Sequence, residues 1–232
     1  MMKFIKNYAC VFLKEISSLV IGDLHIGYEF ELKNQGINVA YTEKIKEDIE
    51  VCRNKTKAKN IILLGDTKHS IGLPTNKKEI EKLKDFFDFL KEKFEKIYVV
   101  KGNHDGLIEK IIKDEKINIY SSRGFSLLKY GFFHGNSYPI SNVLKSKIIF
   151  CSHAHSKYLL PKDKKIYELR IFSIFGLKKE FGKNKKLIII PPFSPLLAGK
   201  EIEEVIKSSN IIKKLVDIEN IEIYSLDGIK LE

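Results

Sequence analysis

Short apolar runs alternate with amphipathic segments along the first half of the chain. The apolar runs are rich in Ile, Val and Leu and are too short for buried helices, so they indicate buried strands. The amphipathic segments carry apolar side chains at helical spacing, and Thr42 and Asn76 stand where helix-capping side chains are expected. Strands are predicted at residues 17–23, 60–66, 96–101 and 117–121, and helices at residues 42–52, 77–94 and 106–114.

The second half of the chain contains mostly β-rich pieces joined by short turns. A helix is expected near residues 201–217, and Asp227-Gly228 marks the turn of a terminal hairpin. A βαβα half followed by a β-rich half predicts an α/β fold in which two sheets pack face to face with helices outside. Because no linker, repeat or low-complexity stretch interrupts the pattern, residues 1–232 are predicted to form a single domain.

Polar side chains follow the apolar runs at five places, and all six histidines lie at or just beyond these places. In an α/β sheet, ligands bind at the carboxyl ends of the strands. Side chains at positions i and i+2 of a strand point to the same face, so His153 and His155 are expected on one side. The clusters are Asp23 with His25, Asp66 with His69, Asn103 with His104 and Asp105, His134 alone, and His153 with His155.

The clustering of these histidines indicates a metal site rather than a set of core residues. A single buried histidine is usually structural, and a lone Gly-Asp after a strand is usually a turn or a helix cap. Two imidazoles on one side of a strand end, however, can each reach one ion of a closely spaced pair. His69 is the weakest member, because its position three residues after Asp66 fits either a supporting place behind the site or simple exposure.

The composition places the chain among globular proteins without a membrane span. Hydrophobic residues make up 44% of the 232 residues and charged residues 31%. No window approaches 18 uninterrupted apolar residues, and Lys14 and Glu15 interrupt the apolar start, so neither a membrane span nor a signal peptide is expected. Three cysteines without CxxC spacing are typical of buried thiols in a reducing compartment, which predicts a cytoplasmic location.

The net charge of +11 raises the question of a polyanionic partner, and nucleic acid is the obvious one. Only three of the 41 basic residues are arginines, and the rest are lysines. Lysines spread over all faces would serve solubility, and a coding bias or a hot habitat would enrich them equally. Binding to DNA or RNA is therefore an expectation that rests on charge alone.

The order of these motifs resembles that of the calcineurin-like metallophosphoesterases. The chain carries DLH, GD, GNHD, a histidine before glycine, and HAH in the family's order between residues 22 and 155. A narrower resemblance, carried by IGDLHIGYE, LLGDTKH, FFHGN and IIIPPFSPLLAGK, is to archaeal phosphoesterases related to the SbcD nuclease, which are similar to the bacterial ligase-associated phosphoesterases. The resemblance implies a four-layer αββα sandwich of two mixed β-sheets flanked by helices. Ser152 departs from the family's glycine, so the backbone that faces the substrate is expected to differ.

The resemblance also implies the roles of the site residues. Asp66 would bridge two ions, and His104 would be a general acid for the leaving group or a clamp on the phosphoryl group. Asp105 would orient the ring of His104. Carboxylate, amide and imidazole donors suit Mn²⁺, with Fe, Zn or Ni as alternatives. One ion would be held by Asp23, His25 and His155, and the other by Asn103, His134 and His153.

The implied activity is hydrolysis of phosphodiester bonds by metal-activated water, as in a nuclease or a nucleotide phosphodiesterase linked to DNA repair. A phosphomonoesterase is the alternative within enzymes, because the sequence does not define the shape of the pocket. A non-catalytic binding or scaffold protein on the same fold is the alternative from another class. Such a protein is expected to have lost ligands or His104, and this chain retains all of them.

Overall fold

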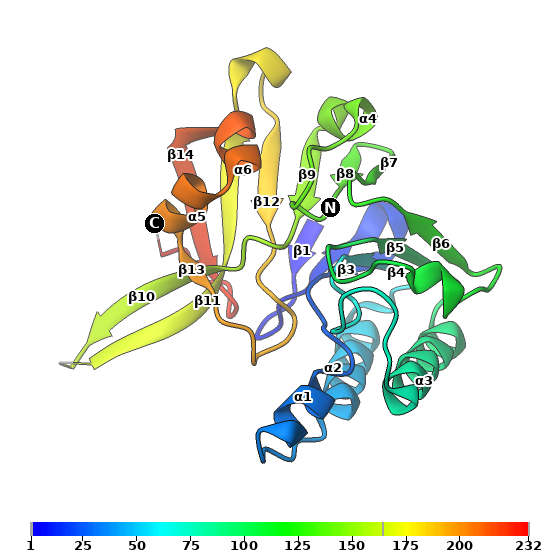
Figure 1. Ribbon diagram of the computed structural model, residues 1–232. Helices are drawn as coiled ribbons and strands as arrows, with labels where there is room; N and C mark the ends of the chain where they lie inside the picture. The colour runs from blue at the N-terminus through cyan, green and yellow to red at the C-terminus, as the bar shows by residue number, and fades with distance from the viewer. Residues whose placement is uncertain (1, 164, 232) are drawn as a thin grey trace.

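The first of two β-sheets contains the elements nearest the N-terminus. A computed structural model describes residues 2–163 and 165–231 (Figure 1). In this part of the chain the first sheet has the order β1-β2-β3-β4-β5-β6, with β3 to β6 parallel and β1 and β2 antiparallel. The strands are β1 (Met2–Phe4), β2 (Val11–Leu13), β3 (Ser18–Ile21), β4 (Asn60–Leu64), β5 (Lys96–Val100) and β6 (Ile117–Tyr120).

The second sheet has the order β13-β10-β11-β12-β9-β8-β7 within the described residues, and β14 pairs with β11. It is also mixed, because β9 is parallel to both β8 and β12 while β11 is antiparallel to β12. Its strands are β7 (Phe125–Leu127), β8 (Tyr130–Phe132), β9 (Ile148–Cys151), β10 (Ser156–Lys162), β11 (Lys165–Leu177), β12 (Lys186–Ile189), β13 (Lys200–Glu201) and β14 (Val216–Ser225).

Helices cover the outer faces of both sheets (Figure 1). Those on the first sheet are α1 (Tyr28–Asn34), α2 (Tyr41–Thr56) and α3 (Lys77–Lys93), and those on the second are α4 (Ser141–Lys145), α5 (Ile202–Ser208) and α6 (Asn210–Leu215). Short 3-10 turns are η1 (Lys14–Ile16), η2 (Ile108–Lys110) and η3 (Lys179–Phe181).

Three hydrophobic cores separate these four layers. The central core lies between the sheets, where Val20 and Ile62 of the first sheet belong to one cluster with Phe150 and Phe172 of the second. A second core packs α2 and α3 against the first sheet, and a third packs α5 and α6 against the second. Side chains alternate between the two faces of a strand, so each β-sheet supplies residues to two cores. The predicted αββα sandwich of two mixed sheets is confirmed.

Two predicted helices are wrong in detail. Residues 106–114 form only the 3-10 turn η2, because Leu107 before it has a left-handed backbone with φ 60°. Residues 201–217 form two short helices instead of one. The break falls at Ser209, whose backbone is extended and whose hydroxyl accepts the amide hydrogen of Ile212 to cap α6. Local capping therefore outweighs the helical period in this segment.

One feature that the hydrophobic pattern did not predict is the hairpin of β10 and β11, which projects from the body in Figure 1. The strand β10 begins directly after His155, so the arm continues from the polar cluster. The short helix α1 and the strands β1 and β2 were not predicted either. No helix in the described residues is long and apolar enough to cross a membrane.

Candidate metal centre and active site

The carboxyl ends of strands from both sheets meet at one edge of the sandwich. Two contacts join the edges directly: the hydroxyl of Ser152 donates to the carbonyl oxygen of Leu64 at 2.6 Å, and the amide of Phe193 donates to the carbonyl oxygen of Gly22 at 2.9 Å. The backbone amide of His153 also donates to Asp23 Oδ2 at 3.2 Å. All five predicted polar clusters therefore converge at the edge where the parallel strands of both sheets end.

Five polar residues of this edge lie beyond the strands in left-handed backbone conformations. The φ angles are 54° for Asp23, 48° for His25, 47° for Asp66, 60° for His153 and 44° for His155. His153 and His155 both face the donor groups as expected, but left-handed backbone and not strand alternation places them there. Left-handed backbone costs a residue with a side chain about 1–2 kcal/mol. Such strain persists where the surrounding structure fixes it, commonly at functional sites.

This strain leads to a stability prediction at His153, whose side chain is exposed. Replacing it with glycine is expected to give a metal-free protein that is more stable than the His153→Ala variant by about 1 kcal/mol, because glycine adopts positive φ without a Cβ clash. Urea unfolding of both variants in chelator measures the difference. Equal stability, or a less stable glycine variant, would show that the backbone at this position is not strained.

Two glycines of the motifs are required by the side chains packed against them. Gly65 has φ 88°, and a Cβ there would overlap with the ring of His134. A Cβ at Gly102 would overlap with the carboxylate of Asp66. The glycines of the Gly-Asp and Gly-Asn-His-Asp motifs thus allow the functional side chains to approach the backbone closely.

A first group of donors surrounds Asp23, which is fully buried. His155 Nε2 lies 3.2 Å from Asp23 Oδ1, yet neither buried atom has a hydrogen-bond partner among the described residues. His25 Nε2 lies 3.8 Å from Asp66 Oδ2. The oxygens and nitrogens of Asp23, His25 and Asp66 lie within 4.8 Å of one another, close enough to hold one ion. Buried polar atoms without partners are rare, and a cation between them would satisfy both.

A second group of donors lies on the other side of Asp66. The ring of His134 is fixed by Nδ1, which donates to the carbonyl oxygen of Leu64 at 2.7 Å. Its Nε2 therefore faces the donor group, 3.5 Å from Asp66 Oδ2 and within hydrogen-bond distance of Asn103 Oδ1 at 3.4 Å. The ring of His153 lies 4.7 Å from that of His134, measured between centroids. A histidine whose second nitrogen bonds to a carbonyl is the usual arrangement of a metal ligand.

The electrostatics of the edge favour a cation. Burial alone would lower the pKa of His134, but its hydrogen bond with Asp66 and the charge of Asp23 raise that pKa to about 9. Burial would likewise raise the pKa of Asp66, but His134 and the amide of His104 hold it well below its usual range. A metal ion would replace the proton of His134 in this negative potential. The residues present therefore fit divalent cations.

His25 is held in the tautomer that a metal ligand needs. The carboxylate of Glu31 accepts from His69 Nε2 at 2.7 Å, and His69 Nδ1 lies 3.2 Å from His25 Nδ1. In neutral rings His25 Nδ1 then donates to His69, which leaves the lone pair of His25 Nε2 directed toward Asp66. Burial lowers the pKa of His25 to about 4, so this ring is neutral near pH 7. The structure therefore places His69 behind His25, in contact with it.

His104 lies at the open side of the site. Its Nδ1 bonds to the carbonyl oxygen of His69, and its ring centroid lies 4.6 Å from that of His25. Its backbone amide donates to Asp66 Oδ1 at 2.9 Å. Because Nδ1 is used in this way, Nε2 is the nitrogen of His104 that remains for a substrate.

The expected role of Asp105 is wrong. Its buried carboxylate accepts backbone amides from Gly102 at 2.9 Å, Thr67 at 3.0 Å and Lys68 at 3.1 Å. It therefore ties the turn before His104 to the loop after Asp66 and does not hold the imidazole. A carboxylate with three amide donors has little capacity left for a ring nitrogen.

Sequence reasoning missed Lys68, which is fully buried beside this loop. Its ammonium donates to the carbonyl oxygens of Ser70 and His104. Burial lowers its pKa, while the nearby carboxylates of Asp105 and Glu79 oppose that shift. Lys68 thus joins the loop after Asp66 to the backbone of His104. A lysine next to a Gly-Asp motif gives no signal in the sequence that it will be buried.

Ser152 stands where the family has glycine, and its side chain points into the protein. The hydroxyl lies 3.1 Å from His134 Nδ1 in addition to its bond with Leu64. A Cβ at Gly22 would lie 2.7 Å from the Cβ of Ser152, so the side chain of Ser152 fits only because residue 22 is a glycine. The serine therefore contacts the ring of His134 at Nδ1, the nitrogen that faces away from Asp66, and it does not disrupt the candidate metal centre.

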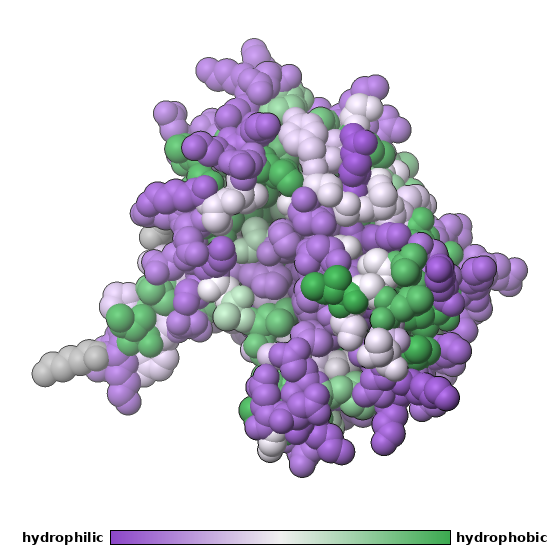
Figure 2. Space-filling view, viewed as in Figure 1, coloured by the Kyte–Doolittle hydropathy of each residue, from purple (hydrophilic) through white to green (hydrophobic). Residues whose placement is uncertain are grey.

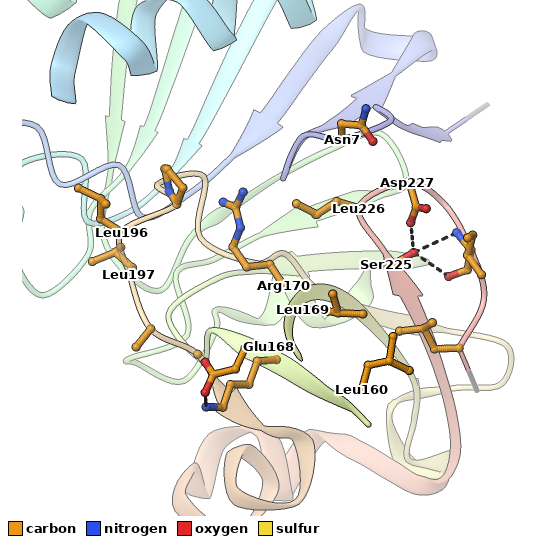
Figure 3. Close-up of a pocket in the computed structure, with 16 residues that line it drawn as sticks. Asn7, Leu160, Glu168, Leu169, Arg170, Leu196, Leu197, Ser225, Leu226 and Asp227 are labelled. Atoms are coloured by element: carbon orange, nitrogen blue, oxygen red, sulfur yellow. Dashed lines mark hydrogen bonds and ion pairs between the residues drawn. The ribbon is translucent and has the colours of Figure 1, made fainter. Parts of the chain in front are cut away.

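A large cavity lies outside the histidine cluster. It has a volume of about 850 Å³ and is mainly apolar, with Arg170 between Leu197 and Leu226 (Figure 3). The guanidinium of Arg170 donates to the carbonyl oxygens of Pro192 and Phe193 at 3.0 and 3.2 Å. None of the predicted site residues lines this cavity. Arg170 connects this cavity to the site. It binds the turn that contains Pro192 and Phe193, and the backbone amide of Phe193 donates to Gly22 beside the site.

Comparison with solved structures identifies proteins of similar fold. A nuclease called MPE from Pseudomonas putida matches with a TM-score of 0.62 and 15% identity, covering 96% of this chain and 92% of that one. The phosphoesterase Yfce of E. coli matches with a TM-score of 0.42 and 13% identity, covering 93% of this chain and 96% of that one. At these identities the first match supports the fold alone. No curated protein sequence matches the chain significantly.

Comparison with family models gives the stronger result. The model described as calcineurin-like phosphoesterase matches residues 16–212, which is most of the chain and includes every predicted ligand. The match agrees with the two-sheet sandwich and with the aspartate and histidine groups at its carboxyl edge. The chain therefore belongs to the calcineurin-like phosphoesterase family and is a metal-dependent phosphoesterase.

Proposed function

We propose that this protein is a phosphodiesterase that works with two divalent transition-metal ions. The observation that carries the proposal is the position of Asp66 between two groups of donors. Its Oδ2 lies 3.8 Å from His25 Nε2 on one side and 3.5 Å from His134 Nε2 on the other. One carboxylate can therefore serve both ions, as is common in two-metal sites.

The proposed ligand sets follow these two groups. Asp23, His25 and His155 would hold one ion, and Asn103, His134 and His153 would hold the other. Mn²⁺ is the ion that we favour, with Fe, Zn or Ni as alternatives, because the donors are carboxylate, amide and imidazole groups without a thiolate. The free cysteines in the described residues are all buried and belong to none of the donor groups.

The ions would activate water and neutralise charge on the phosphoryl oxygens. The residues of the chain hold and orient the reacting groups around them. His104 Nε2 would donate a proton to the departing alkoxide, because Nδ1 is fixed by the carbonyl oxygen of His69. Asp105 and Lys68 would keep His104 in place by fixing the turn from both sides.

A nuclease of the SbcD-related, ligase-associated kind is the subgroup that we propose. The support is the PPFSPLLAGK segment, which contacts the carboxyl edge of the first sheet because the backbone amide of Phe193 donates to Gly22. DNA or RNA would be the substrate, which agrees with the net charge of +11. Figure 2 shows hydrophilic side chains over most of the viewed face, without one separate stripe, so charge alone does not define a path for a strand.

The proposal is tested with bis-p-nitrophenyl phosphate and p-nitrophenyl phosphate, before and after removal of metal and with Mn²⁺ restored. We expect hydrolysis that requires Mn²⁺ and favours the diester, with close to two ions per chain by elemental analysis. Faster hydrolysis of the monoester would instead identify a phosphomonoesterase. A protein that binds two ions and hydrolyses neither compound would be a binding or scaffold protein.

A further inference from the structure

A cavity of about 320 Å³ with a mixed polar and apolar lining lies beside the candidate metal centre. Its walls come from the loop after β8, the loop after β9 and the junction of α5 and α6. His153 lines it, and the ring of His153 lies against that of His134. A group attached to a phosphate at the proposed second ion can therefore extend into this cavity.

Asn136 lines the cavity. Its side-chain oxygen is buried and has no hydrogen bond among the described residues, so the end of the amide that a ligand can reach is the nitrogen Nδ2. Asn136 follows His134 by two residues, so the loop that holds the imidazole also holds the amide. An amide N–H in this position would be satisfied by a ligand that offers a carbonyl oxygen or a ring nitrogen as acceptor. None of the roles assigned above uses Asn136.

The rest of the lining is half apolar and half polar. Val205, Ile211 and Ile212 form the apolar part, and Ser208 and Asn210 contribute hydroxyl and amide groups. No carboxylate lines the cavity, and apart from His153 the only charged residue of its lining is Lys200, which is half exposed. An apolar wall with a few amide and hydroxyl groups suits a flat, uncharged ring with polar edges. A nucleobase has this chemistry, and asparagine is a common partner of base edges.

We propose that this cavity is a subsite for the nucleoside next to the scissile phosphate, in which Asn136 Nδ2 donates a hydrogen bond to the base edge. The inference rests on the proposed phosphodiesterase function and extends it to the substrate class. The volume admits one nucleoside, so the cavity would contact a single nucleotide of the substrate. Lys200 is the basic residue of the lining, and its ammonium lies 3.5 Å from Glu204.

The test compares two diesters that release the same p-nitrophenolate, thymidine 5′-(p-nitrophenyl phosphate) and methyl p-nitrophenyl phosphate. The wild-type protein with Mn²⁺ is expected to favour the nucleoside ester by about tenfold or more in kcat/KM. Asn136→Leu removes the amide and keeps a side chain of similar size. It is expected to lower this preference about tenfold. Asn142→Leu, an exposed position in α4, is the matched control and should retain the preference.

The outcomes separate the subsite from the proposed function. Hydrolysis of both diesters without preference, or a preference that Asn136→Leu leaves intact, would overturn the subsite and leave the phosphodiesterase standing. If neither diester is hydrolysed, the proposed function fails, and equilibrium binding of thymidine 5′-monophosphate decides about the subsite. Binding that Asn136→Leu weakens about tenfold supports the subsite, and binding that does not change overturns it.

Discussion

Asp66→Asn is expected to remove most of the phosphoesterase activity, by about 10³-fold or more. The substitution keeps the shape of the side chain and its capacity to accept the amide of His104, but it removes the charge between the two donor groups. A bound ion is worth several kcal/mol of transition-state stabilisation, and each 1.36 kcal/mol is tenfold in rate. Elemental analysis and the rate on bis-p-nitrophenyl phosphate measure the two effects together.

Asp88→Asn is the matched control for this substitution, because Asp88 is an exposed carboxylate that pairs with Lys91. It should leave both metal content and rate unchanged.

The wild-type protein should also melt several degrees higher with Mn²⁺ than with chelator, because an ion that binds only the folded state stabilises it. An Asp66→Asn protein with two tightly bound ions and full activity would show that Asp66 does not bridge them.

His104→Ala is expected to lower kcat by about 10²–10⁴-fold on a diester with an alkyl leaving group, with metal content unchanged. The reason is the orientation of the ring: Nδ1 is held by the carbonyl oxygen of His69, so Nε2 is directed to the substrate side. The loss should be smaller on a p-nitrophenyl ester, because p-nitrophenolate departs without protonation. Rates on the two kinds of ester, measured at saturating Mn²⁺, give the comparison.

A competing role for His104 comes from its neighbours. The nitrogens of His25, His69 and His104 lie within 4.8 Å of one another, close enough to share an ion. If His104 were a ligand, His104→Ala would lower the metal content, and the two esters would lose rate equally. His69→Ala is the control, because this residue supports His25 from behind through its ring and should weaken metal binding.

The sequence by itself determined the class of the protein. The alternation of apolar runs and amphipathic segments predicted the two-sheet sandwich, because a strand or a helix must bury its apolar face against another layer. The order of the polar clusters predicted which residues gather at the carboxyl edge, and the structure brings Asp23, His25, Asp66, His134 and His153 together there. These features depend on residue type and on chain order, which the sequence states directly.

Only the tertiary structure decided how the site is built. The left-handed backbone of His153 and the hydrogen bonds that commit Asp105 to backbone amides depend on contacts between segments far apart in the chain. The burial of Lys68 and the position of Asn136 in the wall of the cavity likewise follow from the packing of neighbouring loops. Hydrophobic periodicity carries no information about such contacts, because it reports which face of an element is buried and not which atoms meet there.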